Sequence, residues 1–521
     1  LHGIDIDLRA VQISALRLYL KACDLVGPDF RPRRLNLVAS DVTLPAAPPR
    51  DLLDRFDHDR DIRDLLVGIW SELREASKLG SLLHPERKVE ELVAGRREQG
   101  FTLELQDDAA WDRFKLDLLE EIRTEFEKEA DADDVGRRLF GQDLAKSIGL
   151  VEALTRRYDV VVTNPPYAGS KNLDPPVKSF VEREYKDGKR DLYAAFILRC
   201  LEFAHQGGYV GMVTQQSWLF LRSFVKLRER VLTNAAVTTL AHLGAGSFEE
   251  ISGEVVNVAL FTLRKDVPGA GHRITAFRLV GPRSPGEKNR LLREAVADKA
   301  PGILSTPKQA DLQSIPETPF VYWLRPRFFE LLRSRKRLSD IAEVRQGLAT
   351  ADNERFLRCF WEVDRLGVVE DGRPIHGRWF WYAKGGRYQK WAGLEWLVVD
   401  WERDGERIRA TGSRPRVQNT EFYFRPGLTY TQMGRGSMGT RLMEWSIFDV
   451  KGMSIFAPEE SLCGTGALVS TRVASYLLRV TTQNLEFHAG YVGNLPLPAS
   501  PIEQLEGVGG ACIELKRILV S

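Results

Sequence analysis

The chain has 521 residues, 43% of them hydrophobic and 28% charged, with a formal net charge of +2, values typical of a globular protein with several domains rather than of a disordered chain. No apolar run approaches the roughly 18 residues that a membrane span requires, and no positively charged apolar leader opens the sequence, so we expect a cytoplasmic protein. The five cysteines form no CxxC pair, which argues against a disulfide framework and against a metal site such as bound zinc.

The first 45 residues predict a strand, a helix and a second strand. "LHGIDIDLRAVQISALRLYLKAC" is typical of a strand end, a turn at residues 5–7 and an amphipathic helix with apolar residues near 3.6 spacing. The second strand, "LNLVASDVTLP", ends at Asp41. Because the chain begins in the middle of a pattern at Leu1 and stops while "ACIELKRILVS" still resembles a helix, we expect it to be part of a longer protein.

Residues 46–158 predict a helical insertion. They are polar and rich in acidic side chains, and stretches such as "WDRFKLDLLEEIRTEFEKEA" follow a helical pattern. We recognise no catalytic or ligand-binding motif in them.

The next stretch, "DVVVTNPPYAGS" at 159–170, joins a strand to a stiff turn. The short β-branched run predicts a strand covered on both faces, as in a parallel sheet. Each of Pro165 and Pro166 fixes its own φ and pushes the preceding residue away from helical geometry. Open α/β sheets bind ligands at the carboxyl ends of their strands, so Asn164 to Tyr167 are candidate site residues.

The rest of the first half continues the alternation of strands and helices. "DLYAAFILRCLEFAHQGG" predicts a helix that closes with glycine, "YVGMVTQQSWLF" a buried strand, and residues 254–265 a late strand. We therefore expect an α/β domain over residues 1–265, built on a doubly wound parallel sheet.

The composition then changes twice. Pro and Gly punctuate residues 266–330, which predicts a junction. Eight of the eleven tryptophans fall between Trp323 and Trp445, which indicates a separate domain over residues 331–521. Basic side chains are in excess there and acidic ones in the insertion, so the later segment is the better candidate for binding a polyanion.

Polar residues close three predicted strands in chain order, at Asp5, Asp41 and Asn164. In a nucleotide-binding sheet, an acid at a strand end accepts hydrogen bonds from ribose hydroxyls, a role that Asp5 could take. The next residue, Ile6, can cover an adenine face, and Asp41 could accept from an exocyclic amino group.

These motifs resemble the gamma-class N6-adenine DNA methyltransferases, which use S-adenosyl-L-methionine on a Rossmann-like sheet. "NPPY" matches their catalytic motif at Asn164, Pro165, Pro166 and Tyr167, and "GIDID" and "ASDV" match their ribose-binding and adenine-binding motifs. The resemblance implies that Asp5, Ile6, Asp41 and Val42 bind the cofactor and that Phe248 packs against the target base. The resemblance covers residues 1–265 apart from the insertion and implies that they form the catalytic domain. The family's glycine-rich turn is absent, and we expect it to precede Leu1.

The second half resembles the α+β target-recognition domain of BREX phage-defence methyltransferases of the PglX type and of type IIG restriction–modification methylases. "VRQGLATADNERFLRCFWEV", "FDVKGMSIFAPEE" and "NLEFHAGYVGNLPLP" carry this resemblance. It implies double-stranded DNA, together with other defence-system proteins, as partners. Basic residues interleaved with Trp379, Trp381, Tyr388 and Trp391 suit phosphate and base contacts; they are Arg355, Arg358, Lys384, Arg387 and Lys390.

The chemistry explains the catalytic motif. The amino nitrogen of adenine is a poor nucleophile, and acceptors at the Asn164 side-chain oxygen and the Pro165 carbonyl would free its lone pair. Tyr167 would stack on the extruded base. Two alternatives remain open: an RNA or protein-glutamine amino-methyltransferase, and a non-catalytic DNA-recognition subunit. We find no convincing metal-carboxylate cluster for a nuclease.

Overall fold

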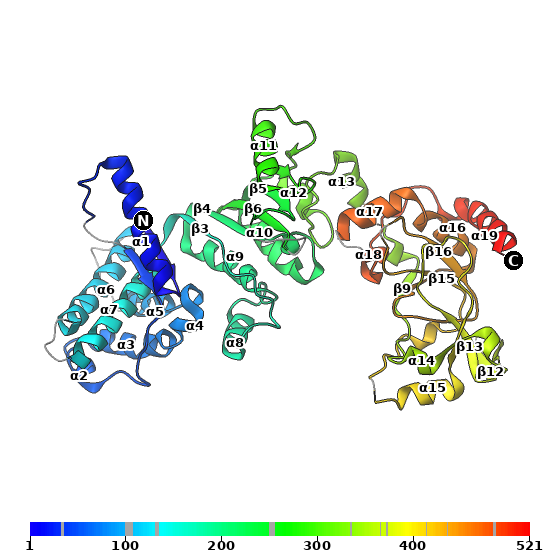
Figure 1. The fold of residues 1–521 in the computed structure, drawn as a ribbon, viewed down its shortest axis with the longest axis horizontal. Helices are drawn as coiled ribbons and strands as arrows, with labels where there is room; N and C mark the ends of the chain where they lie inside the picture. Colours follow the sequence, from blue (N-terminus) through cyan, green and yellow to red (C-terminus); the bar gives the residue numbers. More distant parts are fainter. Residues whose placement is uncertain are drawn as a thin grey trace. The chain divides into compact units, whose positions relative to one another are not determined.

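The computed structural model describes residues 1–32, 36–98, 108–130, 135–249, 256–333, 336–364, 366–370, 373–412, 414–434, 436–482 and 486–520. They form two compact units. Figure 1 shows the helices and strands coloured along the sequence. Unit 1 comprises residues 1–215, 230–268 and 279–301, and unit 2 comprises residues 216–229, 269–278 and 302–521. None of the described helices is both long and apolar enough to cross a membrane.

Unit 1 contains the strands of the predicted catalytic domain: β1 (His2–Asp5), β2 (Asn36–Ala39), β3 (Tyr158–Thr163), β4 (Ala204–Gln215), β5 (Ala236–Gly244) and β6 (Val258–Arg264). β1 pairs with β2 in parallel, and β3 pairs with β4 in parallel. β6 lies between β4 and β5 and is antiparallel to both. The α/β fold is confirmed, but the sheet, which we predicted to be parallel, is mixed. No helix is described between β5 and β6, and strands joined without a crossover pair antiparallel.

The helices of unit 1 fall into three groups. α1 (Leu8–Val26) follows β1, and its N-cap Asp7 accepts a hydrogen bond from the Arg9 N–H. Residues 46–158 hold α2 (Arg50–Asp54), α3 (Arg60–Leu73), α4 (Ala76–Leu79), α5 (Glu86–Glu98), α6 (Asp108–Ala130) and α7 (Val135–Thr155). The later helices are α8 (Pro175–Glu184), α9 (Leu192–Phe203) and α11 (Pro285–Val296), with α10 (Val225–Asn234) divided between the units. α9 ends earlier than predicted, because Ala204 enters β4 directly.

The insertion helices and the strands share one hydrophobic core. Trp70, Ile122 and Leu154 are buried in it, and Ile4 of β1 and Val161 of β3 pack against it. Hydrophobic burial of this extent makes the insertion an integral part of unit 1.

The prediction that β3 is covered on both faces is wrong. Val160 and Val162 are 60% and 75% exposed, whereas Val161, on the opposite face, packs against the insertion core. The reason is that coverage of a strand face depends on the elements packed against it, and the insertion core covers the Val161 face.

Unit 2 is built from short strands around an aromatic core. Two four-stranded sheets have the orders β10-β14-β13-β17 and β16-β15-β18-β9. Their strands are β9 (Glu343–Arg345), β10 (Leu357–Cys359), β13 (Trp379–Ala383), β14 (Leu397–Asp400), β15 (Gly427–Tyr430), β16 (Thr440–Met443), β17 (Ile447–Phe448) and β18 (Ser454–Phe456). β7 (Thr275–Arg278) pairs antiparallel with β8 (Leu304–Ser305). β11 (Val368–Glu370) and β12 (Arg373–His376) form a two-stranded antiparallel sheet.

The helices of unit 2 are α12 (Gln309–Gln313), α13 (Pro326–Leu332), α14 (Asn353–Phe356), α15 (Glu402–Arg409), α16 (Glu459–Val469), α17 (Arg472–Thr482), α18 (Ala489–Gly493) and α19 (Glu506–Val520). The tryptophans divide by environment. Trp379 and Trp401 are buried, whereas Trp361 is 65% exposed. The tryptophan-rich composition therefore reflects the core as well as the surface.

Candidate functional site

The proline turn lies directly after β3. Asn164 is exposed, Pro165 is buried and Tyr167 is half-buried. The Tyr167 hydroxyl lies 3.3 Å from the Asn164 side-chain oxygen and 3.3 Å from the Val213 carbonyl, so its single proton can be donated to either. Burial raises the pKa of the Tyr167 phenol, which keeps it neutral near pH 7. The turn thus presents an amide oxygen beside a neutral aromatic ring.

The amino-terminal end of α9 is hydrogen-bonded to Ala168, the residue that follows the turn. Asp191, the N-cap of α9, accepts hydrogen bonds from the backbone N–H of Ala168 at 3.2 Å and of Tyr193 at 3.4 Å. The Leu192 N–H returns a hydrogen bond to the Ala168 carbonyl. The ring of Tyr193 meets that of Tyr167 edge to face, with 6.1 Å between centroids. α9 therefore contacts the turn both through its backbone and through the Tyr167 ring.

The predicted cofactor residues gather at the ends of β1 and β2. The Ser40 N–H donates to the Asp5 carbonyl, so the two strand ends adjoin. Ile6 is 48% exposed, and Val42 is buried. The Oδ1 atom of Asp41 is buried and has no hydrogen-bond partner among the described residues. A buried, unpaired carboxylate oxygen is costly, so this atom suits a ligand N–H.

The first residues of β1 and β3 contact each other through their side chains. The rings of His2 and Tyr158 have centroids 5.4 Å apart. Ile4 and Val161 also pack against the same core. β1 and β3 belong to different sheets, but side chains of both strands contact each other and share one hydrophobic core.

Phe248 lies in the loop after β5 and is 36% exposed. The base of this loop is fixed by the buried Lys288, whose ammonium donates to the carbonyls of Leu243, Leu279 and Pro282. Gly246 has φ +66°, and an added Cβ would lie 2.3 Å from the Arg283 carbonyl oxygen. Residues 250–255 of the predicted motif lie outside the described residues.

The predicted DNA-binding residues of unit 2 fall into two groups. Arg358 donates to the Glu354 and Leu357 carbonyls, and Lys390 donates to the Ser470 carbonyl at 2.6 Å, so both make internal hydrogen bonds. Arg355 and Arg387 are exposed.

Lys384 lines a cavity of about 400 Å³ together with Trp381 and Trp445. The buried Arg441 also lines it, and burial lowers the pKa of this guanidinium to about 10. Cation and aromatic surface at one cavity suit a planar or anionic group.

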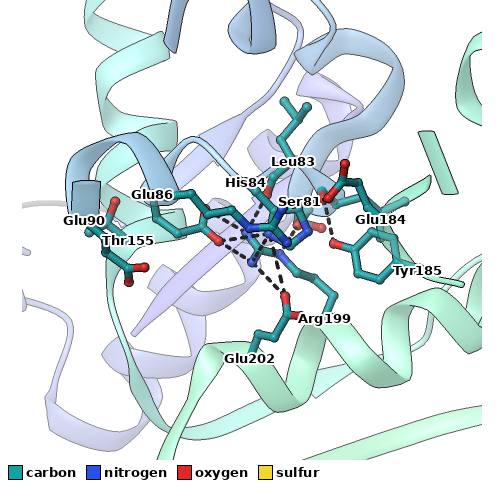
Figure 2. Close-up of polar contacts among 12 residues, drawn as sticks. Ser81, Leu83, His84, Glu86, Glu90, Thr155, Glu184, Tyr185, Arg199 and Glu202 are labelled. Carbon is teal, nitrogen blue, oxygen red and sulfur yellow. Dashed lines mark hydrogen bonds and ion pairs between the residues drawn. The ribbon is translucent and has the colours of Figure 1, made fainter. Parts of the chain in front are cut away.

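Sequence reasoning missed two residues of unit 1, Asp191 and Arg199. The sequence does carry a signal for Asp191, because an aspartate directly before an apolar helical run is typical of an N-cap. Arg199 of α9 is fully buried. It pairs with Glu86 of the insertion, as Figure 2 shows. A lone arginine within the apolar run "LYAAFILRCLEF" was its only signal. No group of three or more His, Cys, Asp or Glu that could hold a metal ion occurs in the described part of the chain.

Comparisons with known proteins agree with the motifs. Residues 1–248 match the model of the Eco57I restriction-modification methylase family. Adenine-specific methyltransferase PglX of Lacticaseibacillus casei (strain Zhang) is 29% identical, over 100% of this chain and 42% of its own length. Adenine-specific methyltransferase BrxX of Escherichia coli O9:H4 (strain HS) is 29% identical, over 74% of this chain and 31% of its own length. The predicted resemblance to adenine-specific methyltransferases is confirmed.

The chain spans less than half of the length of these curated relatives. Among solved structures, the type IIL restriction-modification enzyme MmeI in complex with DNA aligns with 90% of this chain and 71% of its own, at 11% identity and a TM-score of 0.43.

Proposed function

We propose that this chain carries the methyl-transfer site and the recognition part of a site-specific adenine-N6 DNA methyltransferase. The full-length protein would act on cytoplasmic DNA, with other defence proteins, in a restriction–modification or BREX-type phage-defence system. One observation carries the proposal: the exposed Asn164 oxygen stands at the end of β3 in a proline-stiffened turn that α9 holds. The similarity to named adenine-specific methyltransferases supports the choice of adenine.

The proposed chemistry uses the turn as a set of fixed acceptors. The Asn164 side-chain oxygen and the Pro165 carbonyl accept the two N–H groups of the target amino group and direct its lone pair outward. Bound S-adenosyl-L-methionine would supply the methyl group to this nitrogen, and the surplus proton of the amino group would leave afterwards. Tyr167 stacks on the extruded base and stabilises the positive charge that develops. Alignment supplies most of the rate enhancement.

The proposed cofactor is S-adenosyl-L-methionine, which supplies a methyl group on a sulfonium that leaves as a neutral thioether. The residues at the ends of β1 and β2 fit it. Asp41 offers a buried acceptor that has no partner among the described residues, and Ile6 offers an exposed apolar surface for an adenine ring. Asp5 would accept from ribose hydroxyls. Val42 would support this end of the site from the core.

We assign DNA recognition to unit 2. Arg355, Lys384 and Arg387 provide the phosphate contacts, and the aromatic cavity beside Lys384 provides a surface for base edges. Exchanging residues 331–521 for those of a related methylase should move methylation to a different sequence. An unchanged sequence preference would place recognition elsewhere in the protein.

Sequencing that detects N6-methyladenine in DNA from cells expressing the full-length protein tests the proposed function. We expect the modification at one sequence motif, and its loss in cells that express the Asn164→Ala variant. A wild-type protein that leaves DNA unmodified but methylates RNA or a protein glutamine would overturn the choice of substrate. A protein that binds DNA and methylates none of these would be a recognition subunit.

A further inference from the structure

The insertion contacts α9 through a buried ion cluster (Figure 2). The Arg199 guanidinium bonds both carboxylate oxygens of Glu86, with 3.1 Å between Nη2 and Oε2, and lies 3.1 Å from the His84 ring. It also donates to the carbonyls of Ser81 and Leu83. Such a group is strongly destabilising unless its donors are paired, so its partners fix the position of the side chain.

The pKa values of Glu86 and Arg199 are shifted toward their charged forms. Burial by itself would raise the pKa of Glu86, but the hydrogen bonds from His84 and Arg199 lower it to about 2. Burial by itself would lower the pKa of the Arg199 guanidinium. The charge and hydrogen bonds of Glu86 outweigh this effect, so the pKa is raised. Both groups therefore stay ionised throughout the physiological pH range.

A second contact ties the loop before α9 to the same part of the insertion. The buried Tyr185 donates its hydroxyl proton to the Leu82 carbonyl at 2.7 Å, and its ring stacks on His84 with 5.3 Å between centroids. The carbonyls of residues 81, 82 and 83 thus all accept hydrogen bonds from side chains around α9. We call residues Ser81–Glu86 the clamp segment.

α9 links the clamp segment to the proline turn. Arg199 lies eight residues after Asp191, a distance of about 12 Å along a helix. Asp191 holds Ala168, and Tyr193 packs against Tyr167. Because a helix moves as a rigid element, a shift at Arg199 displaces the turn as well, and errors on the order of 1 Å in reacting geometry can cost about 100-fold in rate.

We propose that the clamp segment positions the Asn164–Tyr167 turn through α9, which makes Arg199 and Asp191 positioning residues for methyl transfer. The rate effect rests on the proposed function. The order of the turn does not, so it can be measured in an inactive protein too. The charged insertion, in which the sequence shows no chemistry, thereby acquires a role in catalysis.

Four variants of the full-length protein test this role. Arg199→Lys keeps the charge and loses the planar pairing with Glu86, and Asp191→Ala removes the acceptor for Ala168. Asp191→Asn restores that acceptor. Arg87→Gln is the matched control, because it breaks an ion pair between the insertion and Glu184 of α8 at a more exposed place.

We expect Arg199→Lys and Asp191→Ala to lower kcat about 10-fold or more, while the KM for DNA and the cofactor Kd stay within about 3-fold. Asp191→Asn should recover most of the activity, and Arg87→Gln should match the wild type. Hydrogen–deuterium exchange should quicken at residues 168–172 in the first two variants only. A folded Arg199→Lys or Asp191→Ala protein with wild-type exchange there would overturn the proposal. If Arg199→Lys does not fold, the comparison of Asp191→Ala with Asp191→Asn tests the proposal. A wild-type protein without methyl transfer would instead refute the proposed function.

Discussion

The hydroxyl of Tyr167 lies 3.3 Å from the side-chain oxygen of Asn164, three residues earlier in the same turn. This contact is long for an O–H···O hydrogen bond, and the Val213 carbonyl competes for the same proton. A substrate amino group can therefore replace the tyrosine at the Asn164 oxygen at little cost. The relationship implies separate tasks for the two residues.

Asn164→Ala should reduce methyl transfer about 100-fold or more and leave DNA affinity nearly unchanged. The variant removes an acceptor that acts mainly in the transition state. Single-turnover kinetics and a DNA-binding titration on the full-length protein measure the two effects. An equal reduction of binding and turnover would contradict the assigned role.

The ring of Tyr167 should matter more than its hydroxyl. Tyr167→Phe keeps the stacking surface and should change kcat by less than about 5-fold, because the hydroxyl makes only long contacts. Tyr167→Ala should weaken capture of the extruded base by about 1 to 3 kcal/mol. Fluorescence of 2-aminopurine at the target position reports this capture. A large defect in the phenylalanine variant would assign chemistry to the hydroxyl.

Asp41→Ala should raise the cofactor Kd about 10-fold or more, since it removes a charged acceptor. Asp41→Asn keeps an acceptor oxygen and should have the smaller effect. Calorimetry on the full-length protein gives both values, and DNA affinity serves as the internal control. An alanine variant that binds S-adenosyl-L-methionine normally would place the cofactor elsewhere.

Lys384→Gln and Arg387→Gln should weaken DNA binding and flatten its salt dependence by about one unit of slope for each phosphate that the protein no longer neutralises. Lys390→Gln is the comparison, because its ammonium is hydrogen-bonded to the Ser470 carbonyl. That variant should lower the thermal stability and leave the salt slope unchanged. Equal slopes for all three variants and the wild type would remove this segment from the DNA interface.

Glu86→Gln should make the stability less dependent on pH in acid. The folded-state pKa of Glu86, about 2, lies below its ordinary value of 4.5, so the carboxylate stabilises the fold fully above about pH 4.5. This stabilisation is lost as the pH falls toward 2. The difference in melting temperature between wild type and variant should therefore be largest near neutral pH and shrink below pH 4.5. A difference that stays constant between pH 6 and pH 3 would refute this pairing.

The sequence by itself determined the local parts of the site. The β-branched run and the two prolines specify a strand followed by a stiff turn, because backbone sterics act over a few residues. The strand, turn and helix of the first 26 residues are also specified by local sequence. Asp7 caps that helix because its carboxylate accepts a hydrogen bond from a backbone N–H of the first turn. Asp5 is the last residue of β1, and Asp41 and Asn164 follow β2 and β3, as the sequence predicted.

Only the tertiary structure decided what surrounds these elements. A β-branched run does not reveal whether one face of β3 or both are covered, since coverage depends on helices distant in sequence. The sequence also does not reveal that β6 pairs with β4 and β5, antiparallel to both, because strand pairing is decided by the sheet as a whole. The partner of Arg199 lies 113 residues away, and nothing in the composition of the insertion identifies Glu86 among its many acidic residues. A buried charge is satisfied by whichever group the fold brings to it, and that choice is made by packing of the whole unit.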